Sequence, residues 1–227
     1  LKRIQHMKKT VLVMLAAAVA ATTAFAADDN WVDMFNGENL DGWKSEGGTA
    51  KYTVEDGMIV GTTVDGSPNT FLCRGPYSDF VFVCEVKCDT PLNSGIQFRS
   101  HVWKKDIEQY MKRGQSNIGV VYGYQCEISP DKPHRCGHVW DEHRRRTWLD
   151  TFKDKKGASN PYKVGEWNRY RIKVEGNHIE TWINGKKVAD FKDDMDTTGF
   201  IGLQVHSVKT GTGPYSVRWR NIRIKEL

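Results

Sequence analysis

Motifs that mark several common enzyme chemistries are missing from this chain. The sequence has no Gly-x-Ser-x-Gly elbow, no phosphate-binding P-loop, no His-Glu-x-x-His zinc motif and no dinucleotide fingerprint. It also has no internal repeat, heptad pattern or low-complexity tract. Nothing in the sequence therefore supports a serine or cysteine nucleophile, nucleotide binding or an identifiable cofactor, while dependence on a divalent metal stays open.

A surplus of charge of one sign is also missing from most of the chain. The 227 residues include 33 basic and 28 acidic side chains, a formal net charge of +5. Four of the basic residues and no acid fall within residues 1–26, so the remainder holds 29 basic and 28 acidic residues, a formal charge of +1. A near-neutral domain has no electrostatic footprint for nucleic acid or an anionic membrane surface, and we expect neither as a partner.

The first 26 residues are typical of a cleavable signal peptide. Residues 7–9 (Met-Lys-Lys) form a basic start, residues 11–21 are apolar, and residues 24–26 (Ala-Phe-Ala) fit the small-x-small cleavage rule. We predict cleavage after Ala26, with residues 1–6 as an upstream extension. The apolar run is too short for a comfortable membrane span, and no cysteine follows it as a lipoprotein would require. The sequence predicts a periplasmic or secreted protein.

Five cysteines in an exported protein suggest disulfides with one thiol left over. Cys84 and Cys88 fall in one predicted strand, where four residues span about 13 Å, too far for a disulfide. Cys126 and Cys136 flank a turn over residues 129–133 and are predicted to be able to bridge it. Buried free thiols are an equally ordinary interpretation.

Short strands separated by turn signals recur from residue 52 to the end. The predicted strand segments are residues 52–60, 80–87, 93–100, 118–128, 169–174, 178–183, 200–207 and 217–224. Residues 103–115 and 141–156 are instead predicted as charged loops. Strands at this spacing without helical periodicity are typical of an antiparallel sandwich. We therefore expect residues 27–227 to form a single all-β domain of two antiparallel sheets.

Three of these segments alternate apolar residues with chemically capable ones: residues 93–99, 123–128 and 202–206. Side chains alternate between the faces of a strand, so Arg99, Glu127 and His206 can meet on one polar face if the strands share a sheet. The same face would carry three amides able to donate to and accept from sugar hydroxyls, namely Gln97, Gln125 and Gln204. The alternative is an ordinary solvated sheet face.

The charged loops hold further candidates. Asp141 and Glu142 are either carboxylates at the rim of a site or the acidic half of a surface ion-pair patch with residues 144–146. Indole rings either stack on a sugar ring or seal the loops onto the sandwich. The tryptophans in or beside these loops are Trp103, Trp140 and Trp148.

A metal site in the same region is disfavoured. Four residues there are possible ligands: His134, Cys136, His138 and His143. Their spacing matches no standard zinc pattern. The sequence therefore predicts no structural metal site here.

Several motifs, in order, resemble the 3-keto-disaccharide hydrolase family. They are residues 35–43 (FNGENLDGW), 93–99 (NSGIQFR), 123–128 (GYQCEI), 140–142 (WDE) with Arg145 and residues 148–149, 202–206 (GLQVH) and 220–225 (RNIRIK). The resemblance spans residues 31–227. One departure is His143, which stands where the family pattern leads us to expect glycine.

The resemblance implies a concanavalin A-like jelly-roll sandwich with a sugar site on its concave sheet. It also implies an exported enzyme that cleaves 3-keto-disaccharides or 3-keto-glycosides, with a small carbohydrate as its substrate. Its oligomeric state stays open.

A ketone at C3 of a sugar acidifies the proton on C2, so a base can remove that proton and expel the C1 substituent before water adds. We expect Glu127 or His206 to be the base, Arg99 to stabilise the enolate, and Asp141 or Glu142 to assist the leaving group. The expected substrate contacts are Asn93, Gln97, Gln125, Gln204, Arg145, Trp103, Trp140 and Trp148. The alternative function is a non-catalytic carbohydrate-binding, lectin-like module.

Overall fold

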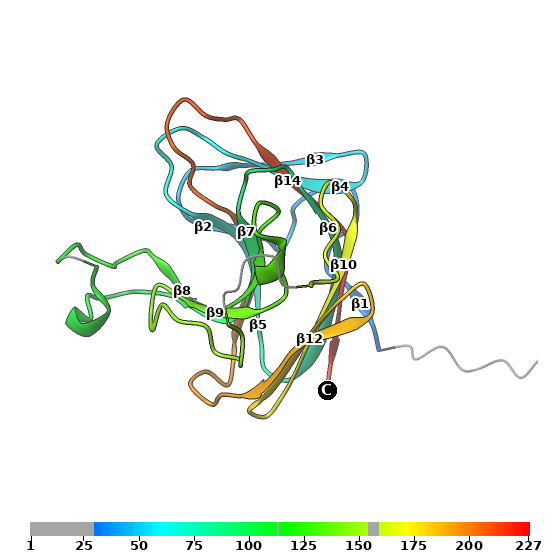
Figure 1. The fold of residues 1–227 in the computed structure, drawn as a ribbon. Coiled ribbons are helices and arrows are strands. Elements are labelled where there is room, and N and C mark those ends of the chain that lie inside the picture. Colours follow the sequence, from blue (N-terminus) through cyan, green and yellow to red (C-terminus); the bar gives the residue numbers. More distant parts are fainter. Residues whose placement is uncertain (1–29, 113, 154–158) are drawn as a thin grey trace, which may run out of the picture.

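The computed structural model describes residues 30–112, 114–153 and 159–227. Two antiparallel sheets make up most of this part of the chain (Figure 1). The predicted signal peptide lies outside the described residues, and no helix within them is long and apolar enough to cross a membrane.

The first sheet has the strand order β12-β11-β10-β6-β14-β4-β3, with β1 paired to β14, and the second has the order β2-β5-β13-β7-β8-β9. The first contains β1 (Val32–Asp33), β3 (Lys51–Glu55), β4 (Met58–Thr62), β6 (Phe80–Cys88), β10 (Asn168–Glu175), β11 (His178–Ile183), β12 (Lys186–Lys192) and β14 (Ser216–Glu226). The second contains β2 (Lys44–Gly47), β5 (Thr70–Tyr77), β7 (Ser94–Val102), β8 (Val121–Ile128), β9 (Val139–Glu142) and β13 (Gly199–Val205). Two single-turn 3-10 helices, η1 (Glu108–Tyr110) and η2 (Pro133–Arg135), lie in connections.

Strand alternation divides the second sheet into an apolar face and a polar face. Ile96, Cys126 and Leu203 are fully buried in the main hydrophobic cluster, which also takes in side chains of the first sheet such as Trp219. The intervening residues turn to the opposite, outer face of the second sheet. The two antiparallel sheets predicted from the sequence are confirmed.

A bulge in β7 interrupts this alternation at Arg99. The pairing of β7 with β8 shifts register between Phe98 and His101, and Arg99 has a left-handed φ of 44°. Gly199 lies against the bulge, where an added Cβ would come within 2.3 Å of the Arg99 carbonyl carbon. The bulge turns the Arg99 side chain off the outer face, and Ser100 takes that position.

The second sheet has one more edge strand, β9, than the sequence predicted. Residues from 141 onward were predicted as a loop, yet Asp141 and Glu142 end β9 and pair with β8. Neighbouring strand residues face opposite ways. Asp141 is fully buried, while Glu142 lies on the outer face.

All five cysteines are described, buried and free. The Cys126 thiol donates to the Gly137 carbonyl at 3.7 Å, and the Cys136 sulfur accepts from the Ser129 amide at 3.1 Å. The predicted Cys126–Cys136 bridge is therefore wrong, because each sulfur is occupied by a backbone partner in the core. Burial raises the pKa of the Cys136 thiol to about 12.

Candidate functional site

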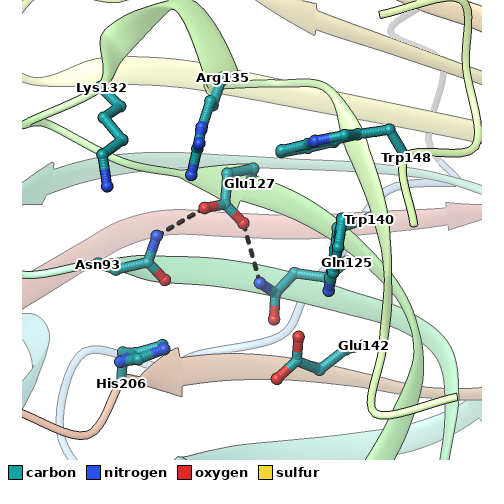
Figure 2. Close-up of a pocket in the computed structure, with 9 residues that line it drawn as sticks. All are labelled: Asn93, Gln125, Glu127, Lys132, Arg135, Trp140, Glu142, Trp148 and His206. Atoms are coloured by element: carbon teal, nitrogen blue, oxygen red, sulfur yellow. Dashed lines mark hydrogen bonds between the residues drawn. The ribbon is translucent and has the colours of Figure 1, made fainter. Parts of the chain in front are cut away.

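A pocket of about 450 Å³ opens on the outer face of the second sheet (Figure 2). It is lined by Asn93, Gln125, Glu127, Lys132, Arg135, Trp140, Glu142, Trp148 and His206. Strands β8 and β9 supply its centre, and the segments flanking β7, β8 and β13 supply its rim. The pocket therefore collects residues from distant parts of the sequence at one end of the sheet.

Glu127 is the buried acid at the centre of this pocket. Its side chain is 6% exposed, and burial raises its pKa from 4.5 to about 7. Hydrogen bonds from Asn93 Nδ2 (2.5 Å) and Gln125 Nε2 (3.0 Å) oppose that rise, and the nearby Glu142 carboxylate adds to it. A carboxyl group with this pKa exchanges protons readily near neutral pH, as a catalytic base or acid must.

A directed chain of hydrogen bonds holds Gln125 in place. Ser100 Oγ donates to Gln97 Oε1 at 2.6 Å, Gln97 Nε2 donates to Gln125 Oε1 at 2.9 Å, and Gln125 donates to Glu127. Each donor points toward Glu127, so the chain favours its ionised form. Gln97 is fully buried and acts inside this chain, away from the pocket lining.

Gly95 makes room for this arrangement. It faces Glu127 across the β7–β8 ladder, and an added Cβ would lie 2.5 Å from Gln125 Cδ. The Gln125 amide passes over this glycine toward the carboxylate. Gln204 lies fully buried on the neighbouring strand, with both amide atoms lacking a hydrogen-bond partner among the described residues.

His206 and Glu142 occupy one side of the pocket (Figure 2). His206 Nδ1 lies 2.6 Å from the Ser207 carbonyl oxygen. A carbonyl can only accept, so Nδ1 carries the hydrogen and Nε2 of the neutral ring is left to accept a proton. Asn69 Nδ2 donates to Glu142 Oε1 at 3.1 Å and Asn69 Oδ1 accepts from the Ser207 amide at 2.9 Å, which ties the two groups together.

His143 touches Glu142 from the far side. Its Nδ1 lies 3.1 Å from Glu142 Oε1 and 3.2 Å from the Val121 carbonyl oxygen. Its φ of 50° is left-handed, a conformation that glycine adopts most easily. The left-handed backbone explains why glycine suits position 143, where this chain instead has a histidine that contacts Glu142.

Two cations that sequence reasoning missed stand on the opposite side of Glu127. Lys132 and Arg135 extend toward the space beside Glu127 and Asn93 (Figure 2). The positive charge of Arg135 acts to lower the pKa of Glu127. Both belong to the turn and 3-10 helix that follow β8. The only sequence signal was two basic residues shortly after a strand that carries an acid.

The predicted aromatic contacts divide into two groups. Trp140 and Trp148 line the pocket and pack edge to face, with ring centroids 5.2 Å apart. Trp103 instead stacks on Tyr122 at 3.7 Å and on Tyr110 at 5.5 Å, in the segment that projects from the body before β8 (Figure 1). Trp103 seals its loop.

Arg99 does not join Glu127 and His206, and that predicted convergence is wrong. Its guanidinium donates to the carbonyls of Ser78 (2.7 Å), Gly176 (2.8 Å) and Asp196 (3.1 Å), and forms an ion pair with Asp79. The cause is the β7 bulge, which places this 1% exposed side chain among loops away from the pocket.

Asp141 and Arg145 also lie outside the pocket. Asp141 accepts from Arg144 at 3.1 Å and from Arg145, and Arg145 also pairs with Asp193 at 2.6 Å. Asp141 points away because it neighbours Glu142 in a strand. Asp141 forms the expected ion pairs with Arg144 and Arg145, but it is buried, so the prediction of a surface patch is wrong in its location. The pocket-rim interpretation fits Glu142.

The family profile described as 3-keto-alpha-glucoside-1,2-lyase-like domain matches residues 30–225. A search of curated proteins found no match.

Solved structures similar to this chain share its fold. One is a candidate glycosyl hydrolase from Parabacteroides distasonis ATCC 8503, with 22% identity, a TM-score of 0.56 and coverage of 87% of this chain and 94% of that one. Another is carbohydrate-binding module CBM66 from Bacillus subtilis, with 16% identity, a TM-score of 0.58 and coverage of 83% and 98%. A Bacillus licheniformis β-glucanase matches with 11% identity, a TM-score of 0.52 and coverage of 87% and 97%.

These structural likenesses confirm the predicted concanavalin A-like jelly-roll and, at such identities, show the fold alone. The family profile covers most of the chain and carries the assignment. The chain therefore belongs to the family of 3-keto-alpha-glucoside-1,2-lyase-like domains.

Proposed function

We propose that this protein, outside the cytoplasm, hydrolyses the glycosidic bond of 3-keto-glycosides or 3-keto-disaccharides by elimination followed by hydration. Glu127 removes the proton from C2, the bond from C1 to the leaving oxygen breaks, and that oxygen takes up a proton. Water then adds across C1 and C2, which returns a proton to C2 and gives the free 3-keto sugar. The net reaction consumes one water.

The observation that carries this proposal is the state of Glu127. A buried carboxyl group with a pKa of about 7 is a far stronger base than an exposed one. Asn93 and Gln125 keep it oriented toward the pocket. A proton next to a ketone is acidic enough for such a base, whereas the C2 proton of an unoxidised sugar is not.

The order of groups around Glu127 matches the order of atoms in the substrate. Lys132 and Arg135 lie on one side of Glu127, and Glu142 and His206 lie on the other (Figure 2). On a sugar ring C2 stands between C3 and C1. With C2 at Glu127, the cations meet the C3 oxygen, where the enolate charge develops, and Glu142 or His206 meets the C1 leaving oxygen.

Trp140 and Trp148 supply an apolar wall for the sugar ring. An indole face packs against the C–H groups of a sugar, and the edge-to-face packing of the two rings fixes that wall. Gln125 and Asn93 leave polar atoms at the floor for hydroxyl groups. These residues would position the ring, and their loss would act mainly on KM.

The test is turnover of matched substrates by the purified protein. It should release 3-keto-glucose from 3-keto-glucosides and leave the unoxidised parent glucosides intact. Its kcat/KM should rise with pH around a midpoint near 7, because only ionised Glu127 is a base. Glu127→Gln should lower kcat at least about a hundredfold.

The matched control is Glu55→Gln, which neutralises an exposed carboxylate on β3 of the other sheet. It should keep wild-type kcat and KM. Binding of 3-keto-glucosides without turnover by a folded protein would contradict the proposal and favour a carbohydrate-binding module. Equal turnover of oxidised and unoxidised glucosides would also contradict it.

A further inference from the structure

A second pocket, of about 490 Å³, adjoins the first on the outer face of the same sheet. Glu142 and His206 line both pockets, so these two side chains form the boundary between them. The lining of the second pocket includes Pro68, Phe71, Ile118, Val120 and Val121. The two hollows are therefore neighbouring parts of one binding surface.

The floor of the second pocket belongs to a small hydrophobic cluster of its own. Phe71, Cys73 and Val121 form that cluster, with Val102 and Phe200 packed against it. Phe71 and Val121 are each 1% exposed, because they pack within this cluster. Strands β5, β8 and β13 turn these apolar side chains to the outer face of the sheet. In the first pocket, the same face carries amide and carboxyl side chains.

Ile118 stands over this floor with little support from the protein. Its side chain is 58% exposed, one of the most exposed large apolar side chains among the described residues. Pro68 is also exposed and Val120 is half-buried, so these two side chains and Ile118 leave hydrophobic surface along the wall of the pocket. A ligand that covered this wall would remove that surface from water.

The two pockets differ in the chemistry that they suit. The first offers carboxylate, amide, cationic and indole groups, which fit a hydroxylated ring. The second adds an apolar floor beyond Glu142 and His206. With C1 of the sugar at that boundary, whatever is attached to the glycosidic oxygen must extend into the second pocket.

We propose that the second pocket is the leaving-group site and that it selects glycosides whose leaving group has a flat apolar face, as in aryl glycosides. This inference rests on the proposed function for the direction of the substrate. The C1–O bond breaks as the C2 proton moves to Glu127, and the departing oxygen takes a proton from solvent water at the boundary beside Glu142 and His206. Addition of water completes the reaction, which yields a 3-keto sugar and a phenol.

The test compares phenyl and methyl 3-keto-glucosides of the same anomeric configuration in wild type and Ile118→Ser. The substitution should raise KM about fivefold for the phenyl substrate and leave KM for the methyl substrate unchanged, because only the phenyl group reaches Ile118. Comparing variant with wild type on each substrate cancels the different reactivity of the two leaving groups. Val164→Ser is the matched control, since Val164 is 50% exposed and lies outside both linings; it should change neither KM.

Binding measured by calorimetry separates this inference from the proposed function. The wild type should bind unoxidised phenyl glucoside about tenfold more tightly than methyl glucoside, and Ile118→Ser should remove most of that difference. If no 3-keto-glucoside is turned over but this preference is found, the proposed function fails and the apolar site stands. Equal binding of the two glucosides, an equal KM change for both substrates, or tighter binding of a disaccharide than of phenyl glucoside would overturn the inference.

Discussion

Replacing Glu127 by glutamine should make the folded protein relatively more stable as pH rises. The pKa of Glu127 is about 7 in the folded state, against an ordinary value of 4.5 for a glutamate carboxyl group. A group whose folded pKa is raised contributes stability below its unfolded pKa, and that contribution is lost as pH rises through the folded pKa. The window is therefore pH 4.5 to about 7. Each pKa unit corresponds to about 1.4 kcal/mol, so the change is worth about 3 kcal/mol.

Urea unfolding of wild type and Glu127→Gln at steps from pH 4 to 8.5 measures this directly. The free energy of unfolding of the variant minus that of wild type should grow by about 3 kcal/mol across this range. Any constant effect of the glutamine, such as its mismatch with the Asn93 and Gln125 donors, cancels in that change. Glu55→Gln should show a change below about 0.5 kcal/mol. A difference for Glu127→Gln that stays flat with pH would refute the view that burial of this carboxylate sets its pKa.

Three further predictions concern the hydrogen bonds of Gln125, the ion pair of Arg99 and the buried cysteines. Gly95→Ala should displace the Gln125 amide, because the new Cβ would lie 2.5 Å from its Cδ. Glu127 then loses one hydrogen-bond donor, so the midpoint of the kcat/KM pH profile should move above 7. An unchanged midpoint would contradict the role given to the hydrogen-bond chain through Gln125. Arg99→Ala should lower the free energy of unfolding by about 3 kcal/mol, because Asp79 loses its ion pair and three carbonyls lose the hydrogen bonds from Arg99. The kcat/KM of the folded fraction should stay within about twofold. A selective loss of kcat would show that Arg99 takes part in the reaction. A thiol reductant should leave Tm unchanged, and thiol titration of the denatured protein should find all five cysteines free; a reductant-sensitive Tm would reveal a disulfide.

Strand periodicity was enough to predict much of the site. Glu127 and Gln125 lie two apart in β8, and His206 continues the outward series of β13, so one alternation rule placed all three at the same pocket. The apolar partners of that alternation, such as Ile96 and Leu203, are in the core as expected. These positions depend only on local strand geometry and on the strands sharing a sheet.

The predictions that failed depend on local departures from that geometry. Arg99 left the polar face because one bulge moves every later side chain of β7 by one position. Asp141 was grouped with Glu142 because the short edge strand β9 was predicted as loop, and only a strand separates adjacent residues onto opposite faces.

The cations were missed for a different reason. Lys132 and Arg135 reach the pocket through a turn and a 3-10 helix that fold back beside β8. Their place depends on how this connection packs, which has no periodicity to read in a sequence. Turn residues near a strand end that carries a buried acid are nevertheless worth inspecting in similar chains.

Deuterium incorporation at C2 tests the central claim most directly. The wild-type protein is incubated with a 3-keto-glucoside in D2O, and the released 3-keto-glucose is analysed by NMR at early times against product incubated without enzyme. Elimination and hydration predict one deuterium at C2 in every product molecule, and Glu127→Gln should lose that incorporation together with turnover. Product that keeps its C2 protium at full wild-type turnover would show direct displacement at C1 and contradict the role assigned to Glu127.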